Sequence, residues 1–255
     1  MIDTHCHLDL AAFDRDRDAV IARATAAGVV GMLVPAVRPR TWDGVRALAR
    51  RHADVGVRCA LGIHPQIVPE LDDAEWAGDL TARLVEAAAE ACAIGECGLD
   101  GGTDARERQE QIFRAHVRAA RATDKPLIIH VLRAHDAAPR ILREEGPVRG
   151  VLHSYSGGFD LVPIYADLGL AFSFAGPVTY RNARRPIAAA RAVPDALLLA
   201  ETDAPDQAPE AHRGSRSEPA FVAEVIAGLA AARGATAAAI AQLTTANARR
   251  LFAAW

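Results

Sequence analysis

The sequence predicts a single (β/α)8 barrel, and three observations lead to that fold class. The chain has 255 residues, close to the ~250 residues that are typical of such barrels. Short apolar stretches alternate with helical segments, which is the order of a parallel sheet covered by helices. The alternative, an open doubly wound sheet, lacks the Gly-x-Gly-x-x-Gly or Walker loop that would support it. Because no linker or repeat divides the chain, we expect residues 1–255 to form one domain.

Eight short, continuous apolar stretches are the expected strands, since parallel strands buried on both faces have this pattern. They cover residues 2–5, 29–34, 56–61, 92–95, 127–130, 150–153, 170–174 and 196–200. The segments between them and after them have helical character. We expect helices over residues 16–27, 41–52, 79–91, 105–123, 217–234 and 236–251.

Composition limits the class of protein. Hydrophobic residues make up 51% of the chain, enough for a sizeable core. With no apolar run of ~18 residues and no signal-peptide pattern, we expect a cytoplasmic protein without a membrane segment. The net charge of −3 argues against a broad basic surface that coats nucleic acid, although it permits a local phosphate site. The four cysteines are scattered and are expected to be reduced thiols. No protein partner is evident, so we expect a monomer.

Residues capable of metal chemistry gather where the expected strands end. His5 and His7 close the first strand, and residues two apart in a strand point to the same side, which leaves Cys6 on the opposite face. The same kind of side chain ends or follows later strands, at His64, Glu96, His130, His153 and Asp203. The carboxyl ends of barrel strands meet at one mouth, so these groups are expected to lie together there.

Each of these residues also has a structural interpretation. A histidine at a strand end can simply pack or donate a hydrogen bond, and Glu96 or Asp203 could cap the next helix. Four histidines and two carboxylates in this joint pattern nevertheless favour a metal site. Six nitrogen and oxygen ligands exceed the three that one catalytic zinc takes from a protein, so we expect two divalent ions that share Glu96. The ions could be zinc, Mg²⁺ or Mn²⁺.

Seven motifs along the whole chain resemble those of the TatD family of metal-dependent hydrolases, which belongs to the amidohydrolase-like barrels. They are DTHCHLD at residues 3–9, GIHP at 62–65, IGECGLD at 94–100, PLIIH at 126–130, HSYSG at 153–157, ETDAP at 201–205 and TAN at 245–247. The resemblance implies a barrel and metal ligation by His5, His7, Glu96, His130, His153 and Asp203, with Glu96 as the bridge. It also implies phosphodiester hydrolysis in DNA, as in a deoxyribonuclease or 3′-exonuclease.

The sequence departs from the family pattern around the expected substrate pocket. Gln66 stands where a second histidine is common, Gly101 where an aromatic residue is common, and Arg133 lies one residue later than the usual arginine. These changes leave the expected metal ligands intact. We therefore expect the metal chemistry to be retained while the substrate pocket is altered.

The ligand set suggests roles for the residues around it. Asp203 is the expected proton acceptor beside a metal-bound water, and Glu96 holds the ions. Candidates for binding a phosphate oxygen or the rest of the substrate are His64, Arg133, His135, Tyr155 and Arg181. Glu201 and Asp3, one layer deeper in their strands, are expected to support the ligands. Asp9 and Asp100 are expected to be loop or cap residues.

Three functions remain open at this level. The first is a phosphodiesterase that acts on an end of DNA or on another small phosphodiester. The second is a metal-dependent amide or ester hydrolase, for example one that deacylates an aminoacyl ester; its carboxylated-lysine subtype is disfavoured because Lys125 precedes the fifth strand. The third is a binding protein that keeps the fold without catalysis, which the complete ligand set disfavours.

Overall fold

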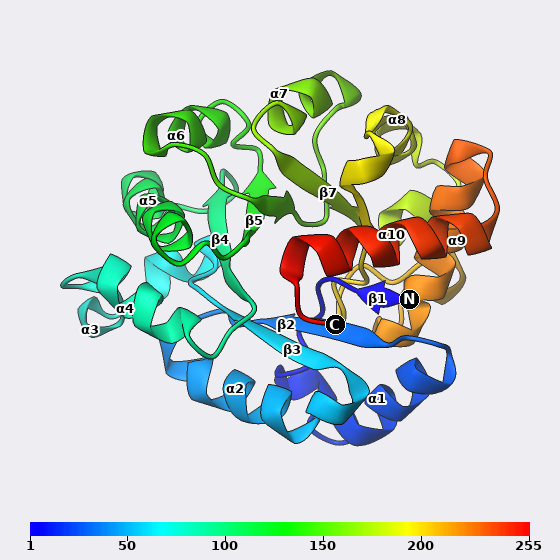
Figure 1. Cartoon of the computed structure of the whole chain (residues 1–255), viewed down its shortest axis with the longest axis horizontal. Coiled ribbons are helices and arrows are strands. Elements are labelled where there is room, and N and C mark those ends of the chain that lie inside the picture. Colours follow the sequence, from blue (N-terminus) through cyan, green and yellow to red (C-terminus); the bar gives the residue numbers. More distant parts are fainter.

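The eight apolar stretches form eight parallel strands that pair in chain order (Figure 1). The computed structural model describes all 255 residues. The strands are β1 (Ile2–Asp3), β2 (Gly31–Pro35), β3 (Val57–Leu61), β4 (Ala93–Asp100), β5 (Leu127–Leu132), β6 (Gly150–Leu152), β7 (Leu170–Phe174) and β8 (Leu198–Ala200). Beyond the short β1, the backbone N–H groups of Thr4 and His7 donate to the carbonyls of Ala200 and Ala204, at 3.2 and 2.7 Å. These bonds bring the last strand against the first, and the predicted α/β barrel is confirmed.

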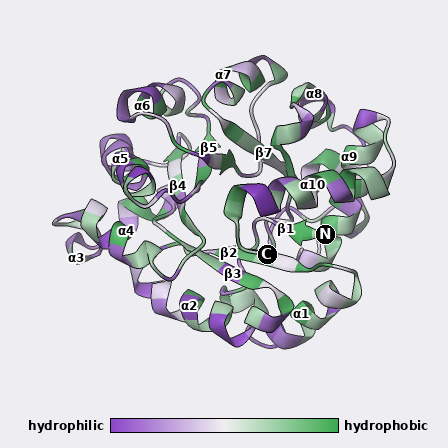
Figure 2. Ribbon diagram, in the orientation of Figure 1, coloured by the Kyte–Doolittle hydropathy of each residue, from purple (hydrophilic) through white to green (hydrophobic).

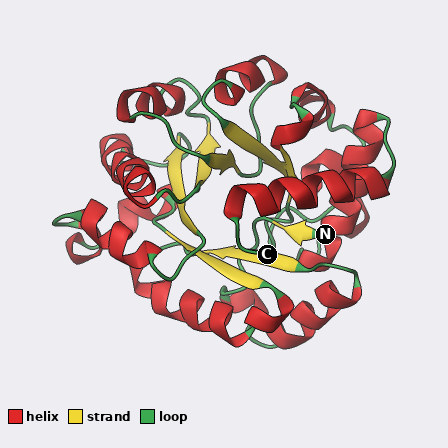
Figure 3. Ribbon diagram, viewed as in Figure 1, coloured by secondary structure: helices red, strands yellow, loops and turns green.

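Ten α-helices surround the strands (Figure 3). They are α1 (Arg17–Ala26), α2 (Trp42–Arg51), α3 (Asp73–Trp76), α4 (Leu80–Ala88), α5 (Arg106–Thr123), α6 (Ala138–Glu145), α7 (Val162–Ala166), α8 (Arg184–Ala192), α9 (Val222–Arg233) and α10 (Ala237–Phe252). The six predicted helices are confirmed as α1, α2, α4, α5, α9 and α10. The sequence pattern did not reveal α3, α6, α7 or α8, which have nine residues or fewer and so offer little periodicity to detect.

The main hydrophobic core lies between the strands and the outer helices. It contains 61 buried residues, among them large side chains such as Phe113 from α5 and Phe172 from β7. Figure 2 shows hydrophobic colouring along the strands, with hydrophilic residues frequent on the surrounding helices. Cys6 belongs to this core, and its Sγ lies 3.6 Å from the carbonyl oxygen of Leu33. The side chain of Cys6 therefore faces away from His5 and His7, as the strand parity predicted.

A second, smaller core fills the interior of the barrel. Each strand contributes one residue to it: Ile2, Leu33, Ala60, Ala93, Ile128, Val151, Ala171 and Leu199. Ala248 and Phe252 of α10 complete this cluster of 10 residues. Helix α10 crosses the barrel in front of the strands in Figure 1. It therefore closes the end where the strands begin and leaves the carboxyl end for polar side chains.

No single helix is long and apolar enough to cross a membrane. The segments Pro219–Arg233 and Ala237–Phe252 reach that length and apolar character only together, and they are bent by 110° at the break between them.

Candidate metal centre

Side chains from β1, β3, β4, β5, β6 and β8 converge at the carboxyl end of the barrel. Their ligand atoms fall into three groups, within each of which all atoms lie within 4.8 Å of one another. The groups are His5–Glu96–His153, His5–His7–Asp203 and His64–Glu96–His130. All six predicted metal ligands are therefore brought together, and His64 joins them as a seventh donor. Its role was predicted as substrate binding, whereas its position also suits a ligand.

Glu96 stands at the centre of the cluster, with its two carboxylate oxygens turned toward different histidines. Oε2 lies 3.1 Å from His5 Nε2 and 3.5 Å from His7 Nε2. Oε1 lies 2.8, 3.1 and 2.7 Å from His64 Nε2, His130 Nδ1 and His153 Nε2. Asp203 Oδ1 lies on the Oε2 side, 3.5 Å from His5 Nε2. One carboxylate thus joins two separate sets of donors, which is a binuclear-type arrangement.

The electrostatics of the cluster follow from its burial. Burial alone would raise the pKa of the Glu96 carboxyl, but His153, His64 and His5 hold it well below its usual value. Burial, together with the neighbouring His5, lowers the pKa of His7 to about 3. Burial raises the pKa of Asp203 to about 6, although His5 and His153 oppose that change. The neighbouring imidazoles therefore favour the ionised form of Glu96, and burial favours the neutral form of His7.

The same cluster fits divalent cations. Oε2 of Glu96 is buried and has no hydrogen-bond partner. Burying a charged oxygen without a partner is unfavourable in free energy unless a cation binds it. Two atoms that ligate one zinc ion lie roughly 3 to 3.5 Å apart, given metal–ligand distances of about 2.0–2.2 Å. The donor pairs around Glu96 and Asp203 lie 2.7 to 3.8 Å apart. Both the charge and the spacing therefore suit metal ions.

Carboxylates behind the histidines orient two of the imidazoles. Asp100 Oδ2 lies 3.2 Å from His130 Nε2. Burial lowers the pKa of His130, but the contacts with Asp100 and Glu96 outweigh burial and raise it. Glu201 Oε1 lies 3.5 Å from His153 Nδ1 and accepts a hydrogen bond from the backbone N–H of Ser154. Such carboxylate partners select the ring nitrogen that faces a metal. Glu201 therefore lies where a supporting role was expected, whereas Asp100 is not the simple loop or cap residue predicted.

Asp203 is positioned by a hydrogen-bonded chain of strained residues. The side-chain amide of Gln207 donates to Asp203 Oδ2, and its Oε1 accepts from Ser154 Oγ at 2.8 Å. All three residues have left-handed backbone conformations, with φ of 56° at Asp203, 52° at Gln207 and 41° at Ser154. Non-glycine residues rarely adopt this conformation, and they cluster at functional sites where the surrounding structure holds them. The chain therefore links the β6 and β8 loops beside the candidate centre.

The whole chain matches known proteins that share this architecture. The model of the family described as "TatD related DNase" matches residues 2–253. The chain belongs to the TatD family of metal-dependent hydrolases. It is similar to "Uncharacterized metal-dependent hydrolase YabD" of Bacillus subtilis, with 34% identity over 99% of this chain and 98% of that protein. It is also similar to "Uncharacterized metal-dependent hydrolase YcfH" of Escherichia coli, with 36% identity over 99% and 95%.

A solved structure of a TatD homologue agrees with the fold. The crystal structure of YjjV from Escherichia coli superposes with a TM-score of 0.91 at 33% identity, covering 99% of this chain and 98% of that chain. The chain is therefore a metal-dependent hydrolase, and the buried histidine and carboxylate cluster is its candidate metal centre.

The departures from the TatD pattern have structural consequences near His130. Gln66, in place of a second histidine, donates from Nε2 to Asp100 Oδ2 at 2.8 Å. It therefore supports the carboxylate that orients His130. At Gly101 a Cβ would lie 2.4 Å from the carbonyl oxygen of Arg133, so the close approach of these two loops excludes a side chain. The backbone at residue 133 therefore requires a glycine at position 101.

The predicted substrate-binding residues occupy different surroundings. Arg133 is exposed beyond β5 and pairs with no carboxylate. Arg181 is 89% exposed, and its Nε lies 3.6 Å from Glu210 Oε1, so the structure does not bring it to the metal cluster. His135 Nδ1 lies 2.9 Å from the Tyr165 hydroxyl, within an aromatic group that includes Tyr155. Their roles toward a substrate remain predictions.

Sequence reasoning missed Asp100, Gln207 and Arg185 as residues of this region; Arg185 lines a pocket together with Ser154 and Gln207. Asp100 has the same strand parity as Glu96, four residues earlier, so the period of two could have identified it. Gln207 and Arg185 carry no such signal, because one lies in an irregular loop and the other on α8. Only the folded chain brings them near His153 and Asp203.

Proposed function

We propose that this TatD-family protein hydrolyses phosphodiester bonds at an end of DNA, using two divalent cations bridged by Glu96. The observation that carries the proposal is the division of donors between the two oxygens of Glu96. A pair of cations bound there would activate a water and stabilise charge on the attacked and leaving oxygens, which is the chemistry that phosphodiester hydrolysis requires.

The residues of the chain have distinct parts in this proposal. Asp203, whose pKa burial raises to about 6, is ionised at neutral pH and accepts a proton from the attacking water. Gln207 holds the second oxygen of Asp203, so the free oxygen faces the cluster. Asp100 and Glu201 keep His130 and His153 turned toward Glu96.

Charge at the mouth favours an anionic substrate. Arg133 is exposed at the end of β5 without an ion-pair partner, so its guanidinium is available to a phosphate oxygen. An aminoacyl ester, the substrate class of the alternative, carries an ammonium group that such an arginine repels. The description "TatD related DNase" of the matching family also supports DNA. We propose that the protein acts as a cytoplasmic monomer.

The test is the release of nucleotides from a single-stranded oligonucleotide labelled at either end. With Mg²⁺, Mn²⁺ or Zn²⁺, the protein is expected to shorten the strand labelled at its 5′ end one nucleotide at a time. Asp203→Asn, prepared identically, serves as the control for contaminating nuclease because it lacks the proton acceptor. Failure to release nucleotides with any of these ions, combined with cleavage of an aminoacyl ester, would favour the alternative hydrolase.

A further inference from the structure

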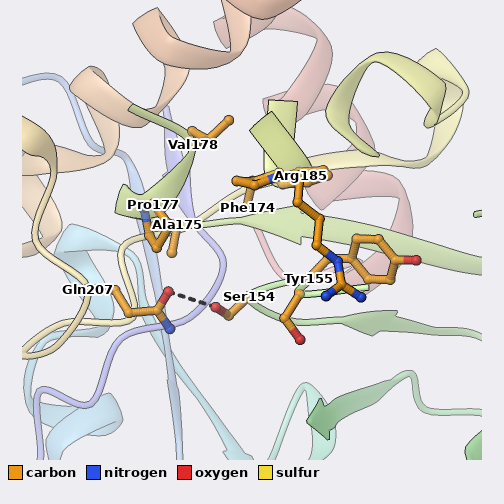
Figure 4. Close-up of a pocket in the computed structure, with 10 residues that line it drawn as sticks. Ser154, Tyr155, Phe174, Ala175, Pro177, Val178, Arg185 and Gln207 are labelled. Atoms are coloured by element: carbon orange, nitrogen blue, oxygen red, sulfur yellow. Dashed lines mark hydrogen bonds between the residues drawn. The ribbon is translucent and has the colours of Figure 1, made fainter. Parts of the chain in front are cut away.

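A small pocket opens beside the metal centre, between the loops that follow β6, β7 and β8 (Figure 4). It has a volume of about 200 Å³. Phe174, Pro177 and Val178 provide apolar walls, and Ser154 and Gln207 provide polar groups on the side of the metal centre. Pockets for drug-sized ligands hold about 300–1,000 Å³. This pocket is therefore suited to one ring-sized group and not to a whole oligonucleotide.

The pocket is continuous with the metal centre through shared residues. Ser154 directly follows the ligand His153, and its Oγ donates to Gln207, whose amide in turn donates to Asp203. Figure 4 shows the Ser154–Gln207 hydrogen bond at the edge of the pocket. A group that fills the pocket is consequently attached close to the atom on which the metal centre acts.

One cation borders this space. Arg185, from α8, is the only charged residue among the ten that line the pocket. It is exposed, and no carboxylate lies within ion-pair distance of it. Its charge also reaches the nearby His135: burial lowers the pKa of His135, and Arg185 lowers it further. Asp136 and Asp160 act on that pKa in the opposite direction. The guanidinium thus remains available to a ligand, and Figure 4 shows it beside Tyr155.

We propose that this pocket binds the base of the terminal nucleotide, with the Arg185 guanidinium donating to acceptor atoms on the edge of that base. A nucleobase is flat and apolar on its faces, as the walls require, and carries hydrogen-bond acceptors on its rim. Arginine is the side chain best suited to donate to such acceptors. The inference rests on the proposed phosphodiesterase function and specifies which part of the substrate is recognised beside the scissile bond.

The test compares two chromogenic substrates that differ only in the base. One is thymidine 5′-(p-nitrophenyl phosphate), and the other is its abasic counterpart, which keeps the deoxyribose and the same leaving group. Water adds to phosphorus in both and p-nitrophenolate leaves, so the ratio of their kcat/KM values isolates the base. We expect the protein to prefer the thymidine compound at least tenfold, which is the scale of base stacking in single-strand binding.

Two variants probe the pocket and a third is the matched control. Ser156→Trp places a large side chain at the pocket from an exposed position, and Arg185→Gln removes the guanidinium. Each is expected to reduce the preference for thymidine about tenfold, mainly through KM, because neither residue contacts the reacting atoms. Arg184→Gln removes a neighbouring exposed arginine that does not line the pocket and should retain the preference. Melting temperature and metal content show whether each variant is folded.

Each outcome has a defined meaning. If the protein cleaves neither compound, the proposed function fails and the inference fails with it. If it cleaves both at equal rates, phosphodiester hydrolysis stands and the base-binding pocket is overturned. A preference that survives in both Ser156→Trp and Arg185→Gln also overturns it, because the base then binds elsewhere. Loss of the preference in either folded pocket variant, with retention in Arg184→Gln, supports the pocket.

Discussion

The bridging position of Glu96 makes a quantitative prediction about metal-linked stability. Glu96→Gln keeps the size of the side chain but removes the charge that faces both donor sets, at 3.1 Å from His5 and 2.7 Å from His153. Even the loss of a residue that only supports a metal ligand typically weakens metal binding 10- to 100-fold. Because Glu96 contacts both sets directly, we expect at least the upper end of that range.

The consequence for stability follows from linkage between binding and folding. A cation at 100 times its Kd stabilises the native protein by about 2.7 kcal/mol, whereas the same concentration after a 100-fold loss of affinity contributes only about 0.4 kcal/mol. In a domain of this size, 1 kcal/mol changes Tm by about 2–4 °C. For each bound ion, the unaltered protein should therefore gain about 5–10 °C on addition of Mn²⁺ or Zn²⁺, and Glu96→Gln less than about 2 °C.

The assay is thermal unfolding of the metal-stripped protein with and without added ion, together with metal content by mass spectrometry. Because each variant is compared with itself, any change in the stability of the metal-free state cancels. Glu90→Gln is the control, since Glu90 lies before β4, away from the cluster, and pairs with Arg50. If Glu96→Gln retained the full metal-induced gain in Tm, the bridging role would be refuted.

Three further predictions concern the supports of the site and the fold. Gln207→Leu removes the amide that holds Asp203 and should lower kcat about tenfold or more, while the exposed neighbour Asp206→Asn should not; steady-state kinetics measures both. Burial lowers the pKa of His116 to about 4, so its neutral form contributes stability that is complete above pH 6.5 and lost as the pH falls to 4. The metal-free protein should lose ~3 kcal/mol over this interval because of His116, and urea unfolding of His116→Gln should show a correspondingly smaller decrease. Phe252→Ala opens the interior core under α10 and should cost about 3–5 kcal/mol while metal binding persists, as measured by denaturant unfolding and metal content.

The fold could be predicted from the sequence because parallel barrel strands are buried on both faces and so appear as continuous apolar stretches. The predicted stretches 29–34 and 170–174, for example, correspond to Gly31–Pro35 and Leu170–Phe174. The fourth strand was predicted as 92–95 but extends through Asp100, since Glu96 and Gly98 interrupt the apolar pattern. The short helices α6 and α7 were missed because fewer than three turns carry little periodic signal.

The candidate ligands could be predicted from the sequence for a related reason. Strand parity turns His5 and His7 to one side, and the topology of a barrel brings the ends of all strands to one mouth. These two rules predict the convergence of Glu96, His130 and Asp203 without any coordinates. In the structure, ligand atoms from different strands lie 2.7 to 3.8 Å apart, as the predicted convergence requires.

What the sequence determined by itself is therefore the barrel, the family and the gathering of metal ligands, all of which depend on period and order along the chain. Only the tertiary structure decided that Asp100 and Gln66 stand behind His130, that Arg181 turns to Glu210, and that Arg185 borders a pocket beside Asp203. The physical reason is that loop and helix side chains take their directions from irregular backbone and from packing between segments remote in sequence. No local periodicity encodes those directions.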